Sequence, residues 1–197
     1  MKFSELSKEA QDRVRYAEPC HEWWDGVYED AKTCAELLGI TFATRQAKLL
    51  NGKTRDDLCL WFSGFGHQGS GAAFEGYWEF KPGICEAIAQ HAPQDQELAG
   101  IAQALCLLQT TTVLELGGRL HTVVDVRGNY SHSGAMTAEV TLDGDSEHVP
   151  EEVRKEAESL MRRFADWIFG QLSEENDYLS SDEYFSQYNF DEDGTII

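Results

Sequence analysis

Two glycine-rich turns, each set between two strand-like runs, constrain the fold of this 197-residue chain more than any other feature. The first turn, "GHQGSG", lies between the runs "LCLWFSGF" and "AAFEGYWEF". The second turn, "GNYSHSG", lies between residues 116–127 and 135–142. Because a short turn rich in glycine between two strand-like runs is typical of a β-hairpin, we expect two antiparallel hairpins, each with one histidine in its turn.

Apolar residues at helical spacing flank these hairpins. The helices expected from this spacing and from capping residues cover residues 8–16, 22–38, 84–92, 94–110 and 150–172, with a short helix after Ser181. The polar segment 45–57 is expected to hold a turn or loop at Asn51-Gly52. We therefore predict an α+β fold, in which the two hairpins form a four-stranded antiparallel sheet packed against several helices.

Length and composition predict how this fold is organised. The length fits a single α+β domain over residues 1–172, with the C-terminal segment 173–197 docked on it. The sequence has no run of about 18 apolar residues and no apolar signal region at its start, so we expect a cytoplasmic protein. Five cysteines without CxxC spacing predict buried, reduced thiols: Cys20, Cys34, Cys59, Cys85 and Cys106.

The net charge of −19, from 35 acids and 16 bases, limits the partners of the chain. Such a surface repels nucleic acid and anionic membranes and attracts a basic surface, although solubility alone also accounts for it. Residues 171–197 hold eight acids and no base, together with five aromatic residues. A solvated acidic tail is poor in aromatic residues, so we expect this segment to be docked or to bind a partner.

The glycine-rich turns match no catalytic motif. Residues 64–69 fit G-x-G-x-x-G, but a dinucleotide site needs a helix next, where a strand is expected here, and the other kinase motifs are missing. A Ser-His-acid triad can be drawn from Ser133, His67 or His132, and Glu75, but the nucleophile-elbow motif is missing. The histidines His67, His121 and His132 with Glu75 also lack the spacing of a metal site. We assign no catalytic residue, metal or cofactor.

Two interpretations of the turns remain open. In the structural one, glycines supply positive φ and let aromatic rings pack on bare backbone. In the other, backbone N–H groups hold an anion and aromatic rings stack on a nucleotide-like ligand. The ligand-binding residues would be His67, Gln68, Ser70, Glu75, Tyr130, His132 and Ser133.

The segment Phe62–Gly76 reads F-S-G-F-x-x-Q-G-x-G-A-x-F-E-G, and it resembles a motif of accessory proteins of tailed bacteriophages and prophages, some of them labelled antitoxin-like. The later "RGNYSHSG" and both ends of the chain resemble the same family. The resemblance implies a phage accessory protein that acts in the host bacterial cytoplasm, and it supplies no catalytic residue. Small acidic proteins of this kind bind and disable host machinery, including CRISPR complexes and other nucleases.

These observations lead to two main hypotheses. In the first, the chain is a non-enzymatic inhibitor whose acidic, nucleic-acid-mimicking surface binds a basic surface of a host defence complex. The partner-binding residues would be Glu174, Glu175, Asp177, Asp182, Glu183, Tyr184, Asp191, Glu192 and Asp193, with Phe185 and Tyr188 as further anchors. In the second, the glycine-rich turns bind or sequester a nucleotide-like signal. A hydrolase acting at the same turns is a third and weaker alternative.

Overall fold

The computed structural model describes residues 1–16, 22–49, 52–128 and 130–197. By its contacts the chain divides into two compact units, which we call unit 1 (residues 1–27 and 170–197) and unit 2 (residues 28–169). The acidic C-terminal segment therefore folds with the N-terminal residues in unit 1. The boundary expected at residue 172 lies inside a continuous helix, α5 (Glu151–Leu179).

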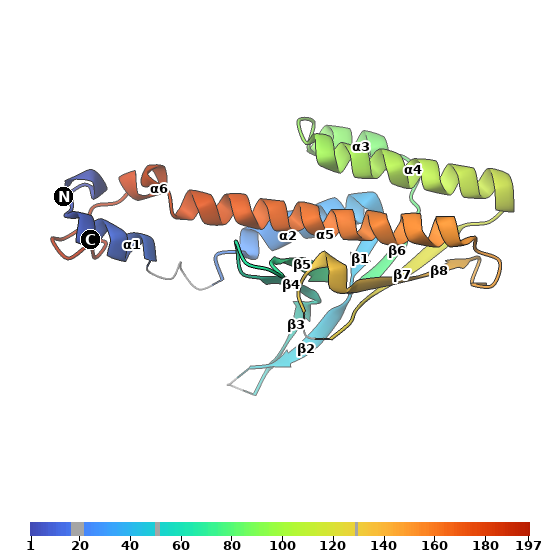
Figure 1. Cartoon of the computed structure of the whole chain (residues 1–197), viewed down its shortest axis with the longest axis horizontal. Helices are drawn as coiled ribbons and strands as arrows, with labels where there is room; N and C mark the ends of the chain where they lie inside the picture. The colour runs from blue at the N-terminus through green and yellow to red at the C-terminus, as the bar shows by residue number, and fades with distance from the viewer. Residues whose placement is uncertain (17–21, 50–51, 129) are drawn as a thin grey trace. The chain divides into compact units, whose positions relative to one another are not determined.

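The described residues form helices and strands in mixed order (Figure 1). The helices are α1 (Lys8–Tyr16), α2 (Asp25–Leu38), α3 (Ile84–His91), α4 (Gln96–Leu116), α5 (Glu151–Leu179) and α6 (Asp182–Ser186), with the short η1 (Phe3–Glu5) and η2 (Ser133–Ala135). The strands are β1 (Ile40–Phe42), β2 (Thr44–Lys48), β3 (Thr54–Leu58), β4 (Leu60–Ser63), β5 (Gly71–Phe74), β6 (Gly76–Glu79), β7 (Leu120–Val126) and β8 (Met136–Leu142).

Unit 2 contains a four-stranded antiparallel sheet in the order β1-β6-β7-β8, which confirms the predicted α+β class. Both predicted hairpins form, as β4–β5 and β7–β8. Only the second one enters this sheet whole. The strands β4 and β5 make a separate two-stranded ribbon. The second run of the first predicted hairpin continues as β6 and enters the sheet, where β1 takes the place that the sequence assigned to the first run.

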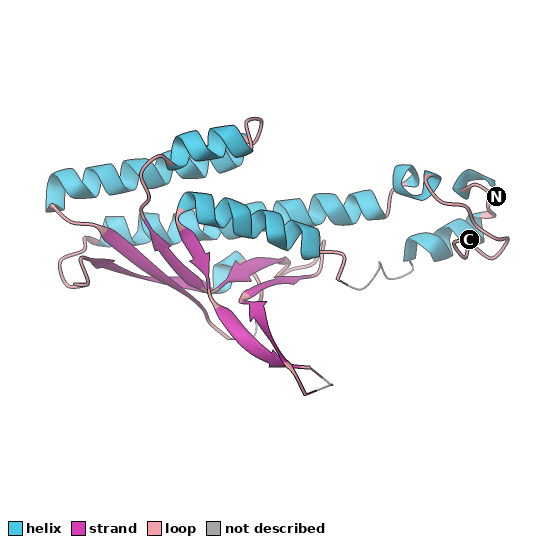
Figure 2. Cartoon of the chain, turned by 180° about the vertical axis from the view of Figure 1, so that it is seen from behind, coloured by secondary structure: helices cyan, strands magenta, loops and turns pink. Residues whose placement is uncertain are grey.

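A junction of three long strands causes this difference. The segments 40–48, 54–63 and 71–79 each change their pairing partner at a single residue: Ala43, Cys59 and Glu75. The N–H of Ala43 donates to the Glu75 carbonyl (2.8 Å), that of Cys59 to Ala43 (2.8 Å), and that of Glu75 to Cys59 (2.9 Å). This ring of hydrogen bonds satisfies the backbone groups that a change of partner would leave unpaired. Figure 2 shows the strands diverging from this region.

The junction also explains one glycine of the phage-like motif. A Cβ on Gly76 would lie 2.1 Å from the Thr41 carbonyl oxygen on the neighbouring strand β1. No side chain fits at that distance, so the close approach of β6 to β1 requires glycine. The Glu75-Gly76 pair therefore marks the place where the chain leaves the β4–β5 ribbon and enters the sheet.

The buried face of the sheet carries the core of unit 2. Within unit 2, the helices α2, α3 and α4 and the part of α5 up to residue 169 lie on one side of the sheet in both ribbon views (Figures 1 and 2). Trp78 is fully buried and its indole N–H donates to the carbonyl of Leu38 at the end of α2 (3.1 Å). Phe164 of α5 packs against the rings of Phe42 and Phe74. The alternation along β7 is as the sequence predicts, with Leu120, Thr122 and Val124 buried.

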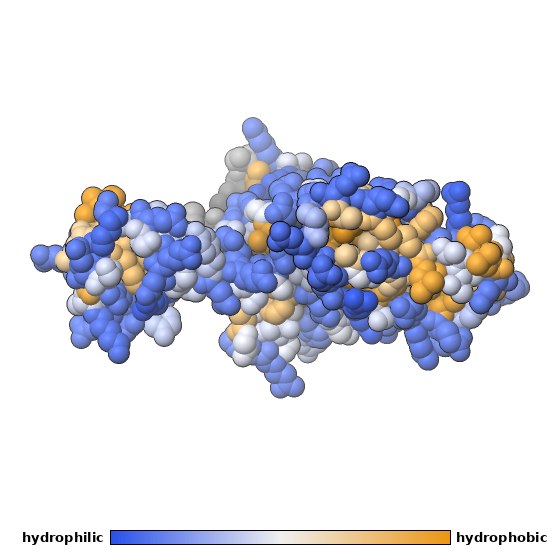
Figure 3. Space-filling model, turned by 90° about the horizontal axis from the view of Figure 1, so that it is seen from above, coloured by the Kyte–Doolittle hydropathy of each residue, from blue (hydrophilic) through white to orange (hydrophobic). Residues whose placement is uncertain are grey.

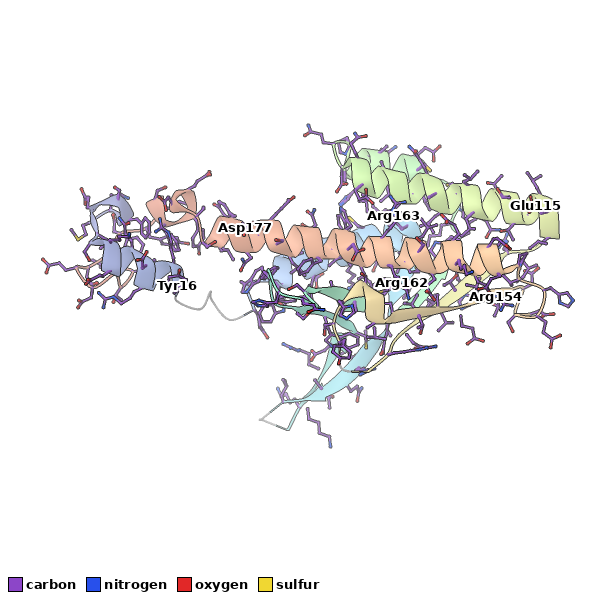
Figure 4. All side chains as sticks on the ribbon, in the orientation of Figure 1. Tyr16, Glu115, Arg154, Arg162, Arg163 and Asp177 are labelled. Carbon is purple, nitrogen blue, oxygen red and sulfur yellow. The ribbon has the colours of Figure 1, made fainter. Side chains whose placement is uncertain are left out.

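Charged side chains of α5 pair with the edge strand β8. Arg162 donates to the carbonyl of Met136 (2.7 Å), and Glu158 accepts the N–H of Ala138 (3.2 Å). Arg162 and Glu158 also form an ion pair with each other (2.8 Å). Figure 4 shows Arg162 on α5 beside this strand. Helix side chains thus occupy backbone groups that an open sheet edge would offer to another strand.

Three elements differ from the sequence prediction in kind or extent. Residues 44–48 and 54–57, for which no strands were predicted, form most of the ribbon β2–β3 on either side of the turn or loop expected at Asn51-Gly52, of which Asn51 lies outside the described residues. This ribbon is exposed on both faces, so its sequence lacks the alternation that reveals a half-buried strand. Helix α4 continues to Leu116 and α5 to Leu179, each beyond its predicted end.

Helix α4 alone among the described helices has the length and composition to cross a membrane, with a mean hydropathy of 1.3. The core helix of a soluble protein passes the same test. Helix α4 buries Leu98, Ile101 and Leu105 within unit 2. The fold is therefore of the soluble type, with one unusually apolar helix.

Four of the five cysteines are free thiols, as expected, and Cys20 lies outside the described residues. Cys34 and Cys59 are buried, whereas Cys85 and Cys106 are half-buried, with their sulfur atoms 3.2 Å apart.

Candidate functional site

An aromatic core orders the acidic C-terminal segment in unit 1. Phe185 and Phe190 are buried together with Phe3, Leu6 and Ala10 from the N-terminal residues. The rings of Phe3 and Phe185 stack with their centroids 4.8 Å apart. The aromatic residues that set this segment apart from a solvated tail are thus mostly occupied with its own packing.

Backbone hydrogen bonds tie the two ends of the chain together. The Met1 ammonium donates to the Phe190 carbonyl (2.7 Å), and the Phe190 N–H donates to the Met1 carbonyl (2.9 Å). The Asp191 carboxylate accepts the N–H groups of Asp193 (3.0 Å) and Thr195 (2.8 Å), which closes the final turn. The last acidic residues of the chain therefore sit on a defined backbone.

The structure separates the nine predicted partner-binding residues into three groups. Three of them have structural roles: Asp182 forms an ion pair with Arg15, Asp191 closes the turn, and Tyr184 packs against the aromatic core. Glu175 is half-buried. The remaining five are exposed and form no ion pair with another described residue. We call these five the acidic set: Glu174, Asp177, Glu183, Glu192 and Asp193.

Unit 1 concentrates the negative charge of the chain. Its 55 residues contain fourteen of the 35 acids and four of the 16 bases, a net charge of −10. The 142 residues of unit 2 contain the other twenty-one acids and twelve bases, a net charge of −9. The charge density of unit 1 is thus much the higher, and a basic molecule meets the stronger field there.

Part of this charge lies where it opposes helix stability. Glu174, Glu175 and Asp177 occupy the last two turns of α5, and the last turn contains no base. Figure 4 shows Asp177 close to the C-terminal end of this helix. An acid in the last turn, such as Asp177, faces the negative end of the helix dipole at a cost of about 0.3–1 kcal/mol, and the cost is smaller for an acid one turn earlier. Helix stability therefore does not explain these acids.

The two glycine-rich turns of unit 2 adjoin each other. The single proton of the Ser63 hydroxyl lies within hydrogen-bonding reach of two carbonyls, that of Gly69 in the first turn (2.8 Å from the oxygen of Ser63) and that of Ser131 in the second (3.2 Å). Gly71 packs so closely on His132 that a Cβ would lie 2.7 Å from the His132 Cβ. The fold thus brings the two predicted turns to one place.

The predicted ligand-binding residues near this contact differ in how exposed they are. His67 and Gln68 are exposed in the first turn, where the Ser70 hydroxyl accepts the His67 N–H (3.0 Å). Tyr130 is exposed, with its ring centroid 5.9 Å from that of the half-buried His132. Ser133 begins the short helix η2 next to His132.

Glu75 lies at the strand junction and not in the turns. It binds Arg45 (2.6 Å), whose guanidinium lies over the Trp61 ring, 5.3 Å from its centroid. Burial raises the pKa of the neighbouring Cys59 thiol, and the charge of Arg45 opposes that shift. Sequence reasoning missed Arg45 because no strand was predicted for its polar segment, and nothing in the pattern of that segment linked Arg45 to Glu75.

His121 takes part in a different arrangement. Its ring pairs with Glu79 (3.2 Å) beside a shallow cavity of about 250 Å³, lined also by Arg119 and Asp143. Among the described residues, no group of three His, Cys, Asp or Glu side chains lies close enough to hold a metal ion. The four candidate metal ligands of the sequence are therefore not gathered into one site.

Comparison with known proteins gives one match. Residues 23–182 match the model of a family described as a domain of unknown function (DUF8835). No curated protein and no solved structure matches the chain. The likeness of residues 62–76 to phage proteins therefore stays a prediction.

Proposed function

The chain belongs to the family described as a domain of unknown function (DUF8835), a description that assigns no activity, and we propose its function from its own residues. In this proposal it is a phage-encoded, non-enzymatic inhibitor that acts in the host bacterial cytoplasm. It binds a basic, nucleic-acid-handling surface of a host defence complex, either a CRISPR complex or another nuclease. The observation that carries the proposal is the acidic set, held exposed on the ordered backbone of unit 1.

A fixed backbone conformation strengthens binding by such an acidic surface. Carboxylates on a fixed backbone lose little conformational freedom when they bind, and they can stand where a basic groove expects phosphates. In unit 1 the aromatic core and the hydrogen bonds between the chain ends provide this order. The two acids near the end of α5, Glu174 and Asp177, reduce helix stability, so a role in binding accounts for them better than a role in folding.

The assignment to a phage rests on the motif at residues 62–76, and the type of partner rests on charge. A surface of this charge favours encounter with basic proteins, and this attraction weakens as salt increases. The salt dependence of partner binding is therefore part of the test.

The test compares the tagged chain with two variants in affinity capture from bacterial lysate at low and moderate salt. The first variant changes the acidic set to lysine. The second changes five exposed acids of unit 2 to lysine: Glu36, Asp125, Glu139, Glu147 and Glu156. Each raises the net charge by ten, from −19 to −9, so the pair separates the position of the charge from its total.

We expect the wild type and the unit 2 variant to retain a basic nuclease or CRISPR subunit that the acidic-set variant loses. Equal retention by the two variants would refute the proposal, because the location of the acids would then not matter. Retention that does not weaken with salt would exclude charge as its basis.

A second candidate function is favoured by the contact between the two glycine-rich turns. It is the binding of a nucleotide-like signal, with the exposed His67, Gln68 and Tyr130 around the ligand. This function predicts that Gln68→Ala or His132→Ala lowers affinity for a panel of nucleotides, while the acidic-set variant binds them normally. A thermal-shift screen that shows no stabilisation by any nucleotide would oppose it.

A further inference from the structure

The outer face of helix α4 exposes large apolar side chains on the surface of unit 2. Leu107 and Leu114 are 68% and 81% exposed, unusual values for leucine within a helix. Figure 3 shows apolar surface gathered over the part of unit 2 that is nearest the viewer, where this helix lies. Contiguous exposed apolar patches on a soluble protein often mark sites of interaction with another molecule.

Five of the exposed residues of α4 form one narrow stripe, and Val113, Glu115 and Leu116 near the end of the helix are exposed outside it. At 100° per residue, five exposed residues of α4 fall within about 100° of one another around the helix axis. We call them the α4 stripe: Gln103, Leu107, Thr110, Thr111 and Leu114. The two leucines are seven residues apart, about 10.5 Å along the helix, which is the spacing of one heptad in helix–helix packing.

The stripe differs from the rest of the surface in charge. Residues 98–114 contain no charged side chain, and the sequence has no Lys or Arg between Lys81 and Arg119. The Thr110 hydroxyl already donates to the carbonyl of Cys106 (2.8 Å), so covering it leaves no donor without a partner. This surface can therefore be buried at little polar cost.

The absence of charge selects among the molecules that can cover the stripe. An anionic lipid surface attracts helices through lysine and arginine, which this face lacks. A basic protein would find no acid there. A second copy of the chain carries the same net charge of −19 and is repelled over most of its surface, but two stripes can meet without facing like charges.

The spacing of the stripe also suits two-fold symmetry. When two α4 helices pack antiparallel about an axis between residues 110 and 111, Leu107 of one copy meets Leu114 of the other, and Thr110 meets Thr111. The same two leucine contacts then form twice. We propose that the α4 stripe joins two copies of this chain in an antiparallel, two-fold dimer.

Sedimentation equilibrium of the full chain tests this proposal. We expect the wild type to be a dimer, and we expect Leu107→Glu and Leu114→Lys each to give a monomer, because each places a charge opposite leucine. The double variant should be a dimer again, since Glu at 107 then meets Lys at 114 of the second copy on both sides of the axis. Both positions are exposed in one copy, so circular dichroism should show the same fold throughout.

A matched control places the same charge on another exposed apolar residue. Val123 on the open face of the sheet is 37% exposed, and Val123→Glu should leave the dimer intact. A monomeric wild type at concentrations of about 100 μM, where even weak pairs associate, overturns the proposal. So does a dimer that survives Leu107→Glu, or a double variant that stays monomeric. If the monomer floats with vesicles of phosphatidylcholine and phosphatidylglycerol, lipid is the occupant instead.

Discussion

Replacing the two exposed acids near the end of α5 by lysine should make the protein more stable and less able to bind its partner. Glu174→Lys and Asp177→Lys each remove an unfavourable charge from the helix C-terminus and add a favourable one. Asp177 lies in the last turn of α5, so Asp177→Lys removes an unfavourable term of about 0.3–1 kcal/mol and adds a favourable one of the same size, roughly 0.6–2 kcal/mol together. Glu174 lies more than one turn before the end of the helix, where the effect of the dipole has fallen off, so Glu174→Lys contributes less. Both side chains are exposed and screened by salt, so we expect about 1–2 kcal/mol for the double variant in low salt.

Differential scanning calorimetry measures this gain. For a chain of this length about 1 kcal/mol corresponds to 2–4 °C in Tm, so the double variant should melt roughly 2–8 °C higher at low ionic strength. The difference should shrink in 0.5 M NaCl, because salt screens the helix dipole and the like charges. In the capture experiment the same variant should retain less of the basic partner.

Glu183→Lys provides the matched control. Glu183 lies in the first turn of α6, where an acid is favourable, so the same charge change should lower Tm instead. Equal stabilisation by both variants would show that relief of net repulsion, and not position in the helix, is responsible. A double variant no more stable than the wild type would refute the reasoning about the end of α5.

Three further predictions concern the fold. Gly76→Ala should prevent folding, because its Cβ would meet the Thr41 carbonyl oxygen, and the loss of soluble expression measures this effect. Gly170→Ala inside α5, where a Cβ meets nothing, should stabilise the protein by about 0.5–1 kcal/mol, which urea unfolding measures. Phe190→Ala should cost about 3–5 kcal/mol in the core of unit 1, seen as early proteolysis at both chain ends. Burial, with smaller effects of the Asp30 and Asp95 charges, raises the pKa of Cys34 from 9.0 to about 11, so the thiol disfavours ionisation in the fold. The un-ionised Cys34 thiol therefore contributes to the free energy of unfolding below pH 9, and this contribution is lost as the pH rises to about 11. The free energy of unfolding should fall by an amount on the order of 3 kcal/mol over this range, and Cys34→Ala should not show this fall.

The sequence predicted elements wherever burial has a simple period. The stripes of α2, α4 and α5 and the alternation in β7 were visible because each element buries one face. The ribbon β2–β3 was missed because neither of its faces is buried. The exchange of partners at the strand junction was also invisible, because it depends on hydrogen bonds between three segments distant in sequence.

The site was predictable only in part, for a related reason. Charge and aromatic content identified the acidic segment, but they did not distinguish an acid that closes a turn, Asp191, from one that faces solvent, Glu192. Glycine content located the two turns, and the structure brings them together. The partner of Glu75 could not be foreseen, since Arg45 reaches it only through the fold.

The phage-like motif itself is largely accounted for by packing. Ser63 links the two turns, Gly71 makes room for His132, Phe74 is buried in the core, and Gly76 makes room for β1. A signature that is mostly occupied with holding three strands together leaves few groups for chemistry. This moves the search for function from the motif to the surfaces.

The extent of the family match then separates the two proposals. Residues 23–182 include all of unit 2 and therefore the α4 stripe, so a dimer through α4 would be a property that other members of the family can be tested for. Three residues of the acidic set, Glu183, Glu192 and Asp193, lie beyond the matched range. Partner binding through unit 1 is therefore a claim about this chain. If Leu107→Glu gives a monomer that still captures the basic partner, the two surfaces act independently, and the dimer serves to present two acidic sets at once.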